Sequence, residues 1–193
     1  MKTYNLFPNY VFEGKLEITN ENFQLIKKDL NDISNSGFVI DTNFGWITNK
    51  KKGLPYNSFK SMGLLMGNIF GDAIRKNFNL NEYNIDVIEP YLISIKPEHE
   101  FPINTERSRW YNGCVWLQTS NKGSNLILED FSSRRYIGPP TIQHTKVIPS
   151  AKNKVVFWPS DIPWGMTPNV SYTDSICLIV TFLAPNINKK TNG

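Results

Sequence analysis

The sequence predicts an α+β fold in which two helices near the N-terminus pack on one side of an antiparallel β-sandwich or barrel. Helical periodicity ends near Phe78, and from about Tyr83 short apolar segments alternate with Gly, Pro, Asn or Ser. A chain of 193 residues, 40% hydrophobic and 20% charged, can bury one substantial core. We therefore expect a single domain over residues 1–185 and a polar tail over residues 186–193.

The first elements follow from local patterns. Residues 5–17 (NLFPNYVFEGKLE) alternate apolar and polar side chains and predict the first strand. A helix should follow, capped by Thr19 or Asn20 and stopped by Gly37. Its apolar stripe consists of Phe23, Leu25, Ile26, Leu30 and Ile33. Residues 36–55 predict a loop-rich segment that contains an ordered turn at Gly45-Trp46.

The second predicted helix covers Tyr56 to Phe78. It repeats glycine at every fourth position, at Gly63, Gly67 and Gly71. Each glycine costs a helix about 1 kcal/mol relative to alanine, so the spacing indicates close packing. Packing against the sheet is the simpler explanation, and contact with another chain is the alternative.

The C-terminal part predicts a series of β-strands. They are expected within residues 83–98, 109–120, 124–131, 145–160 and 175–185. Cys114 and Cys177 each fall inside one of these apolar segments and lack a CxxC or Cys/His context. We expect two buried free thiols in a reducing compartment.

Composition disfavours several classes of function. No apolar run reaches the ~20 residues that a membrane-spanning helix needs, and the N-terminus lacks a signal-peptide core, so secretion is not expected. A net charge of +4 without a dense basic stripe gives no nucleic-acid signal. Neither a phosphate-binding glycine loop nor a Ser-His-Asp signature is found.

Four stretches in order carry a resemblance to a known family. They are NLFPNYVF, SNSGFVIDTNFGW, YNGCVWLQTSNKGSNLILEDF, and VVFWPSDIPWGMTPN followed by SICLIVTF. In order and spacing the chain resembles, over its whole length, a small 2-oxoglutarate/iron(II) oxygenase-like family of marine phages that is related in fold to prolyl hydroxylases. The resemblance implies a double-stranded β-helix (jelly-roll) barrel with two N-terminal helices packed on one sheet.

The same resemblance implies a metal and co-substrate site whose residues have changed. Such enzymes hold iron(II) with two histidines and a carboxylate. The corresponding positions here are Asn104, Glu106 and Trp164, and the arginine that would anchor 2-oxoglutarate corresponds to Cys177. An indole only donates hydrogen bonds, and a thiol cannot replace a bidentate guanidinium. We therefore expect a relict site with no catalytic residue and no bound metal.

The two histidines of the chain, His99 and His144, offer no obvious replacement. His99 and Glu100 would point to opposite faces of a strand, so they would not chelate one ion together. His144 would approach a site only if its loop folded inward. A surface or hydrogen-bonded histidine is the expected state of both.

The function expected from these observations is structural. It is a non-catalytic, cofactor-free protein of the phage virion, in the neck or tail region, made in the host cytoplasm. Its partners would be other protein subunits in a symmetric homo- or hetero-oligomeric assembly, contacted through Arg109, Trp110, Tyr111 and Trp164. Trp110 and Trp164 could instead simply fill the barrel mouth and stabilise the fold. The alternative function is an active hydroxylase with displaced ligands, requiring iron(II) and 2-oxoglutarate.

Overall fold

The computed structural model describes residues 2–6, 9–49, 61–62, 71–78, 83–84, 87–105, 109–129, 145–183 and 186–187. Glu106, His144, Gly63 and Gly67, which entered the sequence predictions, lie outside these residues. No helix within the described ranges is both long and apolar enough to cross a membrane.

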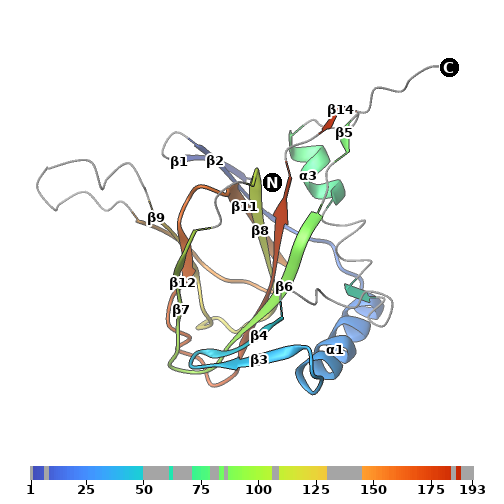
Figure 1. Ribbon diagram of the computed structural model, residues 1–193, viewed down its shortest axis with the longest axis vertical. Helices are drawn as coiled ribbons and strands as arrows, with labels where there is room; N and C mark the ends of the chain where they lie inside the picture. Colours follow the sequence, from blue (N-terminus) through green and yellow to red (C-terminus); the bar gives the residue numbers. More distant parts are fainter. Residues whose placement is uncertain are drawn as a thin grey trace, which may run out of the picture.

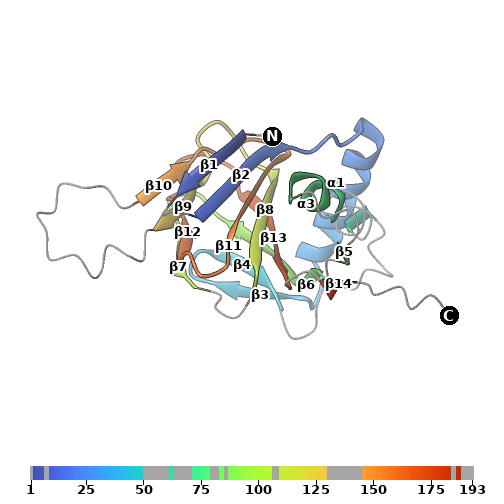
Figure 2. The ribbon, with the colours of Figure 1, turned by 90° about the horizontal axis from the view of Figure 1, so that it is seen from above.

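Two antiparallel sheets face each other, and helix α1 lies on the far side of the larger one (Figure 1 and Figure 2). In spatial order the larger sheet contains β1 (Lys2–Leu6), β2 (Asn9–Lys15), β11 (Lys154–Pro159), β8 (Tyr111–Gln118), β13 (Ser175–Phe182), β6 (Val87–Ile95), β4 (Gly45–Thr48) and β3 (Val39–Thr42). The smaller sheet contains β10 (Thr145–Ile148), β9 (Leu126–Glu129), β12 (Trp164–Met166) and β7 (Phe101–Asn104). This two-sheet arrangement is the jelly roll that the sequence predicted.

The central strands of the larger sheet are buried on both faces. Along β8, Val115 and Leu117 join an outer cluster with α1, while Cys114 and Trp116 join an inner cluster with the smaller sheet. All residues of β13 are buried. Strands covered on both faces read as continuous apolar runs, which explains the sequence pattern of β8 and β13.

Helix α1 (Asn20–Ser34) confirms the first predicted helix. The Thr19 side chain accepts a hydrogen bond from the Asn22 backbone N–H at 3.2 Å, and Ile26, Leu30 and Ile33 are buried in the outer cluster. Of the second predicted helix, the structure describes Ser61–Met62 as helical and α3 (Gly71–Phe78). The remainder of that prediction stays untested.

Several short strands were not predicted. The expected loop over residues 36–55 contains the β3–β4 hairpin. The single strand expected over residues 5–17 corresponds to β2 and the end of β1, which pair with each other as antiparallel strands. The short strands β7 and β12 were missed altogether, because elements of three or four residues carry almost no periodicity. The predicted tail begins with β14 (Asn186–Ile187), which pairs with β5 (Tyr83–Asn84).

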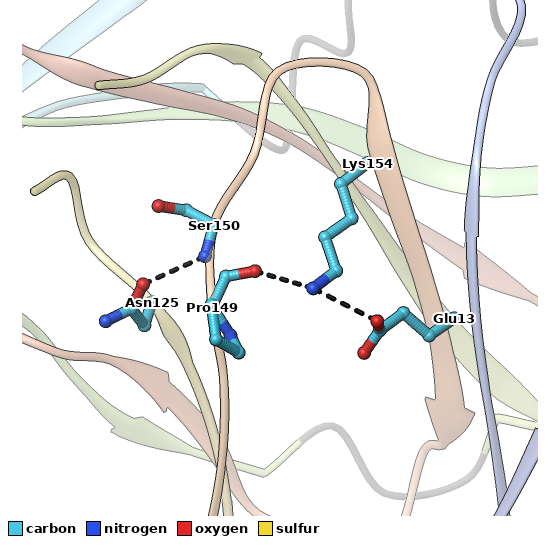
Figure 3. Close-up of polar contacts among 5 residues, drawn as sticks. All are labelled: Glu13, Asn125, Pro149, Ser150 and Lys154. Atoms are coloured by element: carbon cyan, nitrogen blue, oxygen red, sulfur yellow. Dashed lines mark hydrogen bonds and ion pairs between the residues drawn. The ribbon is translucent and has the colours of Figure 1, made fainter. Parts of the chain in front are cut away.

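The connection from β10 to β11 is fixed by polar contacts, shown in Figure 3. Lys154 Nζ donates to the Pro149 carbonyl at 2.7 Å and forms an ion pair with Glu13 on β2 at 3.2 Å. The Ser150 backbone N–H donates to Asn125 Oδ1 at 2.8 Å. These contacts hold the chain where it passes from the smaller sheet to the larger one.

Gly45→Ala is expected to lower the free energy of unfolding by about 2–3 kcal/mol. Gly45 has a φ of 144°, and a Cβ there would lie 2.2 Å from the Ser94 carbonyl oxygen, so the β3–β4 hairpin could not dock on β6 unchanged. Urea denaturation measures the loss. Gly37→Ala is the matched control, because a Cβ at Gly37 meets nothing within 4 Å. Equal losses in both variants would refute this explanation.

Candidate functional site

Asn104 and Trp164 lie opposite each other in the smaller sheet. Asn104 ends β7, Trp164 begins β12, and the two residues are direct cross-strand partners. The next pair is Met166 with Phe101, so β7 carries one extra residue between the two pairs. Such a β-bulge directs both Asn104 and Phe101 to the side of Trp164, facing the barrel interior. Two of the positions singled out in the sequence therefore meet in space.

Trp164 is packed inside a column of aromatic rings. Its side chain is 0% exposed, stacked on Phe101 with ring centroids 5.2 Å apart, and in edge contact with Trp158 at 5.4 Å. Phe101 in turn contacts Phe44 edge-on at 5.2 Å. We call Phe44, Phe101, Trp164 and Trp158 the aromatic column. It occupies the barrel interior between the two sheets.

Of the three predicted metal-site positions the structure describes Asn104 and Trp164, and these two do not match the ligands of an iron(II) site. Trp164 has no lone pair to offer a metal, and its Nε1 makes no hydrogen bond within the described part of the chain. Asn104 is half-buried and offers one neutral amide oxygen. Among the described residues, no group of three or more His, Cys, Asp or Glu side chains could hold a metal ion. This donor set differs from the imidazole and carboxylate ligands that non-haem iron prefers.

Cys177 does not fit the role of an anion anchor either. It is completely buried on β13, opposite Trp116 of β8. Burial raises the pKa of both Cys177 and Cys114 above the ordinary thiol value, so each remains a neutral thiol. Both cysteines are free and belong to the inner cluster, which confirms the predicted buried thiols. A neutral thiol in apolar surroundings cannot balance a carboxylate.

His99 lies in the turn between β6 and β7. Its Nδ1 is 2.8 Å from the Pro97 carbonyl oxygen, and its own carbonyl accepts the Asn169 backbone N–H at 2.9 Å. The neighbouring Glu98 and Glu100 are exposed. The turn thus gives His99 a hydrogen-bonded structural position, as predicted.

The predicted contact patch of Arg109, Trp110, Tyr111 and Trp164 is wrong as a single surface. Trp164 belongs to the inner cluster, whereas Tyr111 belongs to the outer cluster and is 8% exposed. Burial, together with the charge of Asp161, raises the pKa of Tyr111 to about 12. Trp110 packs partly against the outer cluster, so of the four only Arg109 is well exposed. The larger sheet separates the two groups of side chains.

The structure exposes a different apolar site that the sequence analysis missed. In the loop after β12, Tyr172 is fully exposed and Val170 is 67% exposed. The buried Asn169 fixes this loop, because its Nδ2 donates to the carbonyls of Ile95 at 2.8 Å and Thr173 at 2.9 Å. In residues 169–173, the turn-forming residues Asn, Ser and Thr alternate with single apolar residues, and this pattern was the available indication of an exposed loop. We call residues 169–173 the tyrosine loop.

A second apolar surface crosses the outside of the smaller sheet. Val147 pairs with Ile127, and Ile127 pairs with Gly165. Ile103 lies over Gly165, since a Cβ on that glycine would be 2.9 Å from Ile103 Cδ1. Val147 and Ile103 are 45% and 42% exposed. We call Val147, Ile127 and Ile103 the outer stripe.

No protein-family profile matches the sequence, and no curated protein matches it. Solved structures match in fold. The carbocyclase SnoK from nogalamycin biosynthesis, a non-haem alpha-ketoglutarate-dependent protein, aligns with a TM-score of 0.68 at 7% identity over 94% of this chain and 83% of that chain. A prolyl hydroxylase from Trichoplax adhaerens gives 0.62 at 13% identity, over 90% of this chain and 83% of that chain.

An oxidoreductase of the 2OG-Fe(II) oxygenase family from Burkholderia pseudomallei gives a TM-score of 0.59 at 8% identity, over 82% of this chain and 77% of that chain. These similarities establish the double-stranded β-helix fold of the 2-oxoglutarate/iron(II) oxygenases. The jelly-roll fold expected from the sequence resemblance is therefore confirmed, whereas its second N-terminal helix is not.

Trp164→Ala is expected to lower the free energy of unfolding by about 3–5 kcal/mol, because it leaves a cavity between Phe101 and Trp158. Chemical denaturation followed by circular dichroism measures this loss. Tyr172→Ala serves as the control, and its change should stay within about 0.5 kcal/mol, since the removed ring is fully exposed. A Trp164→Ala loss as small as that of the control would contradict the packing role of the indole.

Proposed function

We propose that this chain is a non-catalytic protein of oxygenase fold that acts through contacts with other protein subunits. The observation that carries the proposal is the state of Trp164. The family resemblance expects an imidazole at this position, and the residue is instead a buried indole stacked on Phe101. A buried, stacked indole at this position supports a closed interior rather than a metal site.

The alternative, an active hydroxylase with displaced ligands, has little chemical support. His99, the one described histidine, precedes β7, whereas Asn104 ends it. At about 3.3 Å per residue, the strand alone puts roughly 10 Å between its two ends. A site built on His99 would therefore have to lie at the other end of the strand from Asn104 and Trp164.

Contact with other subunits is supported by the two exposed apolar surfaces. The tyrosine loop presents Tyr172 on a backbone already fixed by Asn169, so binding would cost little additional ordering of the loop. The outer stripe presents aliphatic side chains across adjacent strands of the smaller sheet. Aromatic and aliphatic groups of this kind form the cores of protein interfaces. We propose the tyrosine loop and the outer stripe as contact surfaces in place of the patch that the sequence predicted.

We further propose that the assembly is a phage virion, with this chain in the neck or tail region. The support for this placement is the sequence resemblance to a phage-encoded family. A symmetric particle would use each exposed surface in many equivalent contacts.

Protein reconstituted with iron(II) under anaerobic conditions is expected to convert no 2-oxoglutarate to succinate after oxygen is admitted. The expectation follows from the missing imidazole at Trp164 and the missing cation at Cys177. Succinate release and metal content per chain are the measurements, with a prolyl hydroxylase assayed in parallel as positive control. Succinate formed in proportion to the protein, together with stoichiometric iron, would overturn the non-catalytic proposal.

Ile103→Lys and Tyr172→Ala are expected to weaken assembly, because each removes an exposed apolar group from a proposed contact surface. The readouts are sedimentation velocity of the purified chain and its copy number in purified phage particles by mass spectrometry. Leu25→Ala is the matched control, as Leu25 is similarly exposed, at 47%, but lies on α1. A chain that remains monomeric and is absent from particles would refute the structural role.

A further inference from the structure

A groove separates helix α1 from one end of the larger sheet. It has a volume of about 490 Å³. Its lining residues are Lys27, Leu30, Asn31 and Ser34 from α1, and Trp46, Gln118, Thr173, Asp174 and Ile176 from the sheet side. We call it the helix groove. It lies on the face of the sheet opposite the aromatic column, because Leu30, Trp46 and Ile176 belong to the outer cluster.

One row of residues across four strands runs along the helix groove, and three of its four members, Trp46, Ile176 and Gln118, line it. Trp46 of β4 pairs with Ser94 of β6, Ser94 pairs with Ile176 of β13, and Ile176 pairs with Gln118 of β8. Directly paired residues project to the same face of a sheet. The rest of this face is covered mainly by the apolar outer cluster, with the buried Thr48 hydroxyl bonded to the Leu92 backbone N–H.

Asp174 is held in a fixed orientation beside this row. The hydroxyl of Ser94, which is completely buried, donates to Asp174 Oδ2 at 2.9 Å. Gln118 Nε2 donates to the Asp174 carbonyl at 3.2 Å. Within the described residues the second carboxylate oxygen, Oδ1, makes no hydrogen bond. The groove therefore holds a positioned acceptor whose geometry is set by a buried partner.

The lining also indicates the chemical class of ligand. Lys27 and Asp174 carry opposite charges, so the groove favours neither a simple anion nor a simple cation. Asn31, Gln118 and Thr173 each supply a polar group, which disfavours a lipid chain. Trp46 and Leu30 add apolar surface beside these groups. A neutral ring with several hydroxyl groups and an apolar C–H face matches this combination.

We propose that the helix groove binds a saccharide. One sugar ring lies against Trp46, and its hydroxyls donate to Asp174 Oδ1 and exchange hydrogen bonds with Gln118 and Asn31. The volume falls within the range of about 300–1,000 Å³ that is usual for small-molecule sites. Because the groove lies outside the barrel interior, this proposal holds whether or not the chain is catalytic.

The test titrates the full chain with methyl glycosides of glucose, galactose, mannose and N-acetylglucosamine, and with their β-linked disaccharides. Saturation-transfer NMR detects binding, and calorimetry gives the dissociation constant. At least one probe is expected to bind. Asp174→Asn should weaken that binding about tenfold, because it replaces a charged acceptor with a neutral amide. Gln118→Ala, on an exposed side chain, should weaken it severalfold without affecting folding.

Trp46→Phe keeps an aromatic ring in the groove and gives a second readout. Any ligand-induced change in tryptophan fluorescence should shrink in this variant, since Trp46 is the indole that lines the groove. Lys122→Ala is the control, because Lys122 is exposed and lies outside the groove. Failure of every probe to bind folded protein would overturn the proposal. Binding that Asp174→Asn and Gln118→Ala leave unchanged would overturn it equally.

Discussion

The rest of the structure depends on the burial of both faces of the larger sheet. Side chains alternate along β8 and β13, so one half must be covered by α1 and the other half by the smaller sheet. Removing either cover would expose a continuous apolar surface to water. The barrel interior is thus the second of two cores, and it must be filled by side chains or by a ligand.

The filling of this interior explains how the fold accommodates the large side chain of Trp164. A buried indole contributes about 4–6 kcal/mol at about 25 cal/mol per Å² over its 150–250 Å² of surface. Its unpaired Nε1 costs about 1–3 kcal/mol. The balance favours the closed interior, and stacking on Phe101 adds to it. A metal centre would require the opposite arrangement, with polar groups converging on open space.

The sequence predicted those elements whose pattern is local. The apolar stripe and N-cap of α1, and the apolar runs of β8 and β13, are local in this sense. The β3–β4 hairpin and the strands β7 and β12 depend on pairing with distant strands, which no local pattern reports. The β-bulge in β7 that turns Ile103 outward also cannot be predicted from a local pattern, because it arises from the pairing of β7 with β12. The predicted contact patch was wrong because the alternation of side chains along a strand does not show which of two buried faces a residue occupies. Tyr111 and Trp164 occupy different faces.

A closed interior leaves the outer surfaces of the fold for recognition. In the apolar face beneath α1, this polar row lies near the sheet end, where Gln118 reaches solvent and Ser94 donates to Asp174. Deeper in the same face, an unpaired hydroxyl or amide would pay its full desolvation cost. The next row of this face holds the aliphatic side chains of Leu92, Leu178 and Val115, and beside them the buried Thr48 hydroxyl accepts the Leu92 backbone N–H at 2.9 Å. The polar groups at the sheet end differ in their position, because they surround Asp174 beside the half-buried indole of Trp46 at the helix groove, where a ligand could reach them.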